Sequence, residues 1–445
     1  MKEVIEISEK LNKYFNETGN KVGGEVKFIK RQRKITAISF VKTMILGAIE
    51  GGDNSIESIC QMLYKENIRI TKQGLEFRFT KEAVALMEGM FKEGLKVFRS
   101  NLRVECKMLE YFKTVKILDS SYMSLPNCME DLYKGYCARY PGQESKTKAA
   151  VKIQLMYDYL NQNIAKVDIK EGIRSDQGYK DYLSNIEKKD LFIADLGYFV
   201  PSSFDTISKK GAYFLMRYKA DTNIYDGNEK IEILEYLKNK EKLEMEVFLG
   251  KEAKVKVRLI ANKLPKKLSE ARRRKANKLA KSQGYKSSKR NQKLLDWSIF
   301  ITNIPFDILK AEELLKIYKL RWQIELLFKL YKSNVGIDKL KSKVSSGKIL
   351  CKLYAKLSAI AIFHGLANCV KLERDREFSM TKAMLSLKSH ARELCNILRH
   401  DCEKIAEFFA TMIKSWQIFA IKDRYRKKRI STLQSLTLPS LHPLT

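Results

Sequence analysis

The spacing of apolar residues changes along the chain, and each change predicts a different secondary structure. Over residues 36–110, apolar positions recur at the three- and four-residue spacing of helices. Ser55 and Thr80 precede two of these segments and are typical N-cap residues. The short segment Thr71–Phe79 carries outward basic residues and is a candidate second helix of a helix-turn-helix. A plain helical bundle explains the same pattern equally well.

From residue 115 the pattern becomes that of strands. Strands joined by short turns, followed by a helix and two more strands, predict a mixed α/β sheet. The predicted strands are Val115–Leu125, Ala150–Tyr159, Asn163–Ile169, Leu191–Asp195 and Ala212–Lys219. A helical stretch, Gly178–Lys188, is expected before the fourth strand.

Residues 220–305 have the pattern of an inserted unit that contains further strands. Two strand-like segments, Glu244–Gly250 and Val255–Pro265, precede a charged helix, and Trp297–Ile304 ends the unit as another strand. Leu309–Ser333 then predicts one long helix.

The charge of the chain indicates a polyanionic partner. Lys and Arg number 85 against 52 Asp and Glu, which gives a formal net charge of +33. Nucleic acid is the first candidate and an anionic membrane surface the second. The N-terminus does not resemble a signal peptide, and the apolar stretch Leu357–Val370 is interrupted and shorter than the roughly 20 residues that span a bilayer. We therefore expect a soluble cytosolic protein with no membrane partner.

Basic residues are most concentrated in Lys263–Lys293. This segment holds thirteen basic residues and one acidic residue, with Arg272, Arg273 and Arg274 in succession. Such a run is either a solvated face or a surface that contacts DNA phosphates, and the overall charge favours phosphate contact.

The histidines and cysteines leave little room for several kinds of chemistry. All four histidines lie in the last quarter of the chain, and the eight cysteines occur singly, with no CxxC pair. Ser-His or Cys-His catalysis, a zinc site and a disulfide framework are therefore poorly supported. Carboxylates would have to hold any metal.

Two aspartates follow apolar runs that read as strands. Asp119 follows Val115–Leu118, and Asp195 follows Leu191–Ala194. Open α/β sheets place their ligands at the carboxyl ends of strands. A helix cap or a turn is the ordinary role of such an acid, so each aspartate alone is weak evidence.

A third acid lies on the predicted helix Leu309–Ser333. At about 100° per residue, Tyr318, Arg321, Glu325 and Lys332 fall within a stripe about 60° wide. Large apolar residues surround the stripe, so we expect much of this helix to be buried.

These residues resemble a known family. Tyr318, Arg321, Glu325 and Lys332 stand at the spacing of the Y-R-E-K signature of bacterial insertion-sequence transposases, in the family numbered four. LDSS around Asp119 resembles the first aspartate block of that family. ADLGYF at residues 194–199 is similar to the second.

The resemblance implies a ribonuclease H-like mixed-sheet core of the α/β class. Asp119, Asp195 and Glu325 would be its catalytic residues and would bind two Mg²⁺ ions, with Mn²⁺ as an alternative. The resemblance further implies that several residues contact DNA, most of them through phosphates. These are Tyr318, Arg321, Lys332 and the weaker candidate Arg217, together with Trp297, which would stack on a flipped base unless it is a core tryptophan.

Four regions are expected. They are a helical N-terminal DNA-binding region (1–110), the catalytic core (111–219 and 306–350), the strand-containing insertion with its basic arm (220–305), and a helical C-terminal region (351–445) that is a candidate for dimerisation. The expected function is cut-and-paste DNA transposition in the bacterial cytoplasm. Its expected partners are terminal inverted-repeat DNA, target DNA and a second copy of the chain. An inactive or repurposed DNA-binding protein, or another ribonuclease H-like nuclease, remains an alternative.

Overall fold

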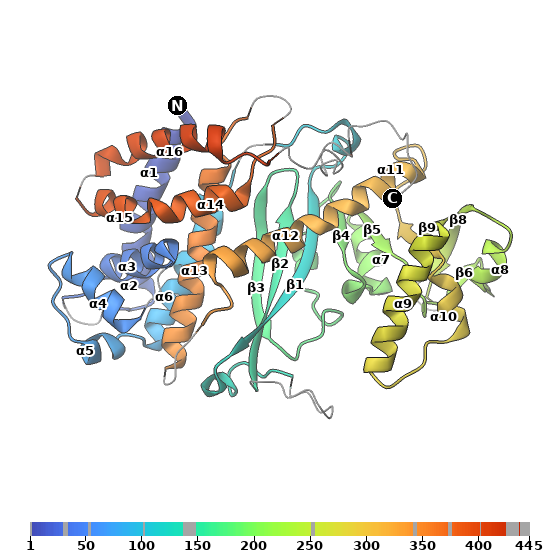
Figure 1. Cartoon of the computed structure of the whole chain (residues 1–445), viewed down its shortest axis with the longest axis horizontal. Helices are drawn as coiled ribbons and strands as arrows, with labels where there is room; N and C mark the ends of the chain where they lie inside the picture. The colour runs from blue at the N-terminus through green and yellow to red at the C-terminus, as the bar shows by residue number, and fades with distance from the viewer. Residues whose placement is uncertain are drawn as a thin grey trace.

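A sheet and a bundle of helices lie side by side in the computed structural model (Figure 1). The described residues are 2–29, 34–51, 55–100, 103–136, 148–250, 254–340, 345–372, 376–400, 402–423 and 436. Helices α11 (Ala311–Tyr318) and α12 (Trp322–Leu330) cross the sheet, with α12 packed on β1 and α11 on β5.

The sheet has ten strands in the order β3-β2-β1-β4-β5-β10-β9-β8-β6-β7. The β1–β4 and β4–β5 pairs are parallel, and the other pairs are antiparallel. The strands are β1 (Val115–Leu125), β2 (Ala149–Asp158), β3 (Asn163–Glu171), β4 (Leu191–Ala194), β5 (Tyr213–Arg217), β6 (Ile224–Asp226), β7 (Glu229–Ile231), β8 (Lys242–Leu249), β9 (Val255–Lys263) and β10 (Trp297–Thr302). Because β10 pairs with β5, the strands of residues 220–305 extend the same sheet.

The two faces of the sheet contribute to different cores. Successive strand residues point to opposite faces. Ile117, Ile193 and Leu215 therefore join one hydrophobic cluster, whereas Leu118 and Ala194 join the other. Four further helices lie between strands of the sheet in the sequence: α7 (Pro201–Lys209), α8 (Ile233–Leu237), α9 (Lys266–Ser282) and α10 (Lys289–Leu294).

The bundle is formed by helices from the first hundred residues together with helices that follow residue 345. Helix α13 packs against α6 and α3, α16 packs against α1, and α14 and α15 pack against α3. In Figure 1 the blue and red helices accordingly lie together. The bundle helices are α1 (Lys2–Lys13), α2 (Gly19–Glu25), α3 (Ala37–Glu50), α4 (Ile56–Tyr64), α5 (Lys72–Glu76), α6 (Lys81–Val97), α13 (Ser346–Ala367), α14 (Met380–Ser389), α15 (Ala391–His400) and α16 (Ile405–Phe419).

Helix α13 is the one described helix that is long and apolar enough to cross a membrane. Within its most apolar window, however, 94% of the residues are buried inside the protein. The helix therefore serves as the core of the bundle, where it is covered on all sides by other elements.

Most predicted elements are confirmed. Ser55 and Thr80 cap α4 and α6 by accepting hydrogen bonds from the amides of Ser58 and Ala83. Helices α4 and α5 pack on each other, but α5 has five residues, so a longer second helix is not formed. Its Lys72 is paired with Glu57 of α4.

Two helix predictions were wrong in detail. Gly178–Lys188 contains a 3₁₀ turn, Asp181–Asn185, instead of an α-helix. Lysine ammonium groups bind carbonyl oxygens that helix amides would otherwise use: Lys166 binds that of Asp181, and Lys210 that of Leu183. The long helix predicted after residue 309 is also irregular.

A 3₁₀ segment, Lys319–Arg321, separates α11 from α12, and a π segment, Tyr331–Val335, follows α12. The uniform 100° spacing assumed for the stripe is therefore approximate, because 3₁₀ turns wind more tightly and π turns more loosely.

Candidate active site

Asp119 and Asp195 lie at the same level on adjacent parallel strands. Asp119 stands inside β1, which continues to Leu125, and Asp195 directly follows β4. Leu118 is paired with Ala194, so the two aspartates are the next residues along the two strands. Neighbouring strands are about 4.8 Å apart. The alternation of side chains directs both aspartates to the face that α12 covers.

The row continues to a cation on the next strand. Ile193 is paired with Leu215, which places Arg217 level with Asp195. Arg217 is in turn paired with Phe300 on β10. Asp119, Asp195, Arg217 and Phe300 therefore form one line across four neighbouring strands on one face of the sheet.

The signature helix lies over this line. The Tyr318 ring meets the Phe300 ring edge-on with centroids 4.8 Å apart, and its hydroxyl lies 3.4 Å from the carbonyl oxygen of Ala194. One turn later, Arg321 Nη2 pairs with Glu325 Oε1 at 2.6 Å. Arg321 and Glu325 both interact electrostatically with Asp119. The helix therefore brings the third acid to the two aspartates.

Burial and neighbouring charges act together on Asp119. The pKa of its carboxyl is raised to about 6, chiefly by burial and to a smaller extent by the negative charges of Asp195 and Glu325. The Ser120 amide, which donates to Asp119 Oδ1 at 2.7 Å, and the Arg321 charge act in the opposite direction. Burial likewise raises the pKa of Tyr318 to about 12, against the charges of Arg321 and Arg217. These shifts show how closely the signature residues and the two aspartates are gathered.

The three carboxylates have the chemistry of a divalent metal site. Mg²⁺ prefers hard oxygen ligands, and Asp119, Asp195 and Glu325 supply them on one face. Among the described residues, no group of three Asp, Glu, His or Cys side chains lies close enough together to hold a metal ion. Glu325 is instead engaged by Arg321. The three carboxylates fit a divalent metal by their chemistry, and Glu325 would have to turn from the guanidinium to the aspartates to complete the set.

The remaining sequence candidates are scattered. Lys332 is half-buried in the π segment, seven residues beyond Glu325, and has no ion pair with any other described residue. Arg273 pairs with Asp296, and the exposed Arg274 pairs with Glu270. Arg272 is partly buried, and its Nη1 donates to the Trp297 carbonyl oxygen at 3.2 Å.

Trp297 faces away from the carboxylates. Its side chain is 8% exposed and packs with Ile299 and Ile301 in the cluster on the opposite face of the sheet. Phe300, of the other parity, faces α11. This placement favours the core alternative, since stacking on a base would require the indole to leave the cluster.

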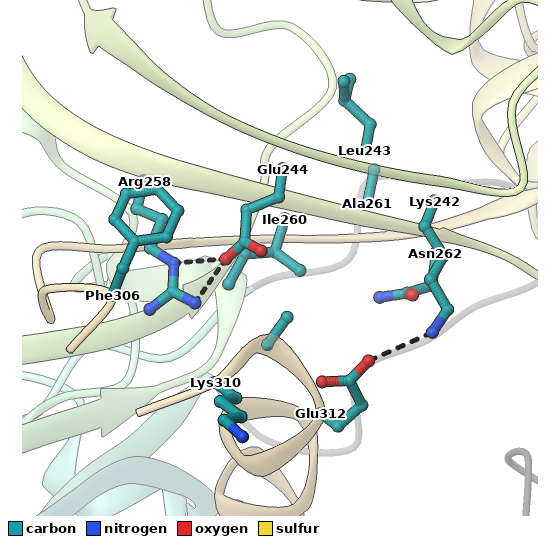
Figure 2. A pocket seen from close by; sticks show the side chains of 11 residues that line it. Lys242, Leu243, Glu244, Arg258, Ile260, Ala261, Asn262, Phe306, Lys310 and Glu312 are labelled. Carbon is teal, nitrogen blue, oxygen red and sulfur yellow. Dashed lines mark hydrogen bonds and ion pairs between the residues drawn. The ribbon is translucent and has the colours of Figure 1, made fainter. Parts of the chain in front are cut away.

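Sequence reasoning missed a second charged cluster on the same face. Arg258 on β9 is 4% exposed, pairs with Glu244 of β8 and lies over the Phe306 ring at 4.3 Å. With the Lys242–Glu312 pair it lines a cavity of about 450 Å³ beside α11 (Figure 2). The available signal was the alternation at the start of β9, where Lys256 and Arg258 alternate with Val255 and Val257 and so point to the other face of the sheet.

The mixed sheet, with carboxylates on two adjacent strands and on a covering helix, defines a ribonuclease H-like α/β enzyme. Residues 110–359, more than half of the chain, match the family described as the transposase DDE domain. The chain belongs to this family and is a DDE-type transposase of insertion sequences.

Individual relatives agree with this assignment over more than nine tenths of the chain. The chain is 28% identical to the transposase for insertion sequence element IS1151 of Clostridium perfringens, over 95% of this chain and 94% of the relative. It is 26% identical to the transposase for IS231D and 25% identical to that for IS231E, both of Bacillus thuringiensis subsp. finitimus. These matches cover 91–92% of this chain and 90–91% of each relative.

Proposed function

We propose that this transposase moves its element by a cut-and-paste route. It nicks the element at its terminal inverted repeats, frees the second strand through a hairpin, and joins the 3′-hydroxyl to target DNA. The observation that supports this proposal is the level pairing of Asp119 and Asp195 on adjacent parallel strands, with Glu325 held over them. Three acids in this arrangement suit phosphoryl transfer without a histidine.

Asp119, Asp195 and Glu325 would hold two Mg²⁺ ions, for which Mn²⁺ can substitute. Such ions supply the positive charge that activates an attacking oxygen and stabilises a leaving oxygen in phosphoryl transfer. Burial is the main cause of the raised pKa of Asp119, and the like charges of Asp195 and Glu325 add to it. A dication would relieve that repulsion.

The cationic residues would hold the DNA strand. Arg321 is released when Glu325 turns toward the aspartates, and its guanidinium is then free to bind a phosphate through two hydrogen bonds. The Tyr318 hydroxyl would donate a hydrogen bond to the same strand, and its raised pKa keeps the hydroxyl protonated. Arg217 and Lys332 would bind phosphates on either side of the carboxylates.

In the first step water would attack a phosphodiester, so that one P–O bond forms while the bond to the 3′-oxygen breaks. The products are a 3′-hydroxyl and a 5′-phosphate, and the hydroxyl is the nucleophile for the joining steps. Because both ends of the element must be cut and joined together, we propose a homodimer that holds the paired ends.

Substitution of the acids tests this function. Asp119→Asn, Asp195→Asn and Glu325→Gln keep the side-chain shape but remove a charged ligand, so each should abolish Mg²⁺-dependent cleavage of a terminal-repeat fragment. Binding of the same fragment in EDTA should persist. Asp205→Asn is the control, because Asp205 pairs with Lys209 on α7, away from the row of acids. Near wild-type cleavage by any of the three variants would remove that residue from the site.

A further inference from the structure

Two arginines from distant parts of the chain converge beside the carboxylates. Arg217 stands at the end of β5, level with Asp195, and Arg272 extends from α9 to the carbonyl oxygen of Trp297 at 3.2 Å. Trp297 begins β10, the strand that pairs with β5. Both arginines are partly buried.

The two guanidinium groups are close enough to repel each other. Burial lowers the pKa of Arg272, and the charge of Arg217 lowers it further. Arg217 also acts on Tyr318, the tyrosine that lies against the end of β4. Positive charge is therefore gathered at this point of the site, next to the row of acids.

Neither arginine has an acidic partner in the part of the chain that the structure describes. Their neighbours behave differently. Acidic partners neutralise the nearby arginines as follows: Arg258 by Glu244 (Figure 2), Arg273 by Asp296, Arg274 by Glu270 and Arg290 by Glu232. The pair Arg217 and Arg272 thus departs from the local pattern in which each arginine is matched by an acid.

Two partly desolvated like charges that have no ion pair among the described residues favour an anion that bridges them. A phosphate group has the size and the acceptor oxygens to receive hydrogen bonds from both guanidinium groups. We propose that Arg217 and Arg272 form one phosphate-binding site, in which the basic helix α9 contributes a single specific contact beside the carboxylates.

This inference rests on the proposed function, since the phosphate would belong to the DNA backbone held for cleavage. Of the three consecutive arginines, the site uses Arg272 alone, because Arg273 and Arg274 are already paired. The next phosphate along a strand lies within reach of the carboxylates, because Arg217 and Asp195 stand on neighbouring strands.

The test measures binding of a terminal-repeat duplex in EDTA over a range of salt concentrations, so that it does not depend on cleavage. On duplex DNA, log K decreases with log salt, and the magnitude of this slope becomes smaller by about 0.9 for each phosphate contact that is lost. Arg217→Gln combined with Arg272→Gln should lower the slope by about 0.9, because both side chains hold the same phosphate. Arg272→Lys keeps the charge and should retain most of the slope.

Arg392→Gln is the control, because Arg392 lies on α15, is exposed and pairs with Glu50. It should leave the slope unchanged, and melting curves should confirm that all variants fold. A double variant with the wild-type slope, or with a loss near 1.8, would overturn the shared site.

A second arm identifies the source of the phosphate. If the site takes only the phosphates of bound DNA, inorganic phosphate should raise the melting temperatures of the wild type and of the double variant equally. Stabilisation of the wild type alone, with an unchanged DNA slope, would overturn the DNA assignment. If the acid variants still cleave DNA but the slope falls as stated, the carboxylate proposal fails while this site stands.

Discussion

The hydroxyl of Tyr331 and Nε2 of His364 lie 2.7 Å apart in the interior of the protein. Tyr331 begins the π segment that follows α12, and His364 lies on α13. The hydrogen bond therefore ties the helix that carries Glu325 to the central helix of the bundle.

Stability should fall in mild acid because of His364. Burial lowers the pKa of its imidazole to about 4, whereas the unfolded chain has a value near 6.5. Between these pH values the unfolded state binds more protons, so stability decreases as the pH falls. The loss attributable to this residue is about 3 kcal/mol by pH 4.

Urea unfolding at pH 7.5 and pH 5 measures the effect. His364→Gln keeps a polar group toward Tyr331 but cannot titrate, so its stability should depend less on pH over this range. An identical pH dependence in the two proteins would contradict the assignment.

A buried ion pair should be essential to the sheet. Lys116 and Asp190 are joined at 2.5 Å, with side-chain exposures of 9% and 0%. Asp190 also accepts from the Thr114 hydroxyl and the Glu187 amide, each at 2.7 Å. Lys116→Met leaves this carboxylate without its cation, and we expect a loss of about 3–5 kcal/mol in the free energy of unfolding.

Calorimetry or denaturant titration checks this prediction. Lys113→Met is the matched control, because Lys113 pairs with Glu187 at the surface and surface pairs contribute about 0–1 kcal/mol. Equal effects of the two substitutions would show that the buried pair has no special weight.

Trp297→Ala should weaken the fold before it affects a particular step of transposition. The indole is packed in the cluster opposite the acids, and truncating such a side chain costs about 3–5 kcal/mol. The melting temperature, DNA binding and first nick should therefore decline together. A denaturing gel that separates nicked from hairpin products, run beside a melting curve, distinguishes this from base stacking. Selective loss of the hairpin at an unchanged melting temperature would restore the stacking role.

Arg321→Gln should bind Mg²⁺ more tightly while cleaving DNA more slowly. The Arg321 guanidinium pairs with the Glu325 carboxylate and adds a positive charge beside Asp119. Its removal frees the Glu325 carboxylate to bind the metal and reduces the repulsion of Mg²⁺. We expect about a tenfold gain in metal affinity, equivalent to about 1.4 kcal/mol. Isothermal titration calorimetry with Mg²⁺ measures the affinity, and a cleavage assay on a terminal-repeat fragment measures the rate.

Lys319→Gln is the control for this substitution, because Lys319 lies on the same 3₁₀ segment but is exposed. It removes the same charge at a distance from the acids. Weaker Mg²⁺ binding by Arg321→Gln than by the control would contradict the competition between Arg321 and the cation.

The three acids could be predicted from the sequence because the residues that mark them are their neighbours along the chain. Asp119 and Asp195 follow apolar runs that form strands, and Glu325 lies at a recognisable spacing on a helix. Their arrangement as neighbours required the strand pairing, which depends on contacts between distant segments.

Other features depended on partners that no local pattern reveals. Arg272, Arg273 and Arg274 are equivalent in sequence, yet Asp296 and Glu270 neutralise the latter two and leave the first. The face on which Trp297 lies is set by the pairing of β10 with β5 and β9. Within Gly178–Lys188, backbone carbonyl oxygens accept hydrogen bonds from lysines of β1, β3 and the end of α7, and no sequence pattern in the segment itself indicates these partners.

The shared bundle determines when the protein can complete its folding during synthesis. Helices α3 and α6 are made early, but α13, against which they pack, follows the entire ten-stranded sheet in the sequence. A growing chain therefore exposes the apolar surfaces of these helices while the sheet is still being translated. Termination of translation before α13 would release a polypeptide in which α3 and α6 lack the helix that covers them, so chaperones and proteases would act on it.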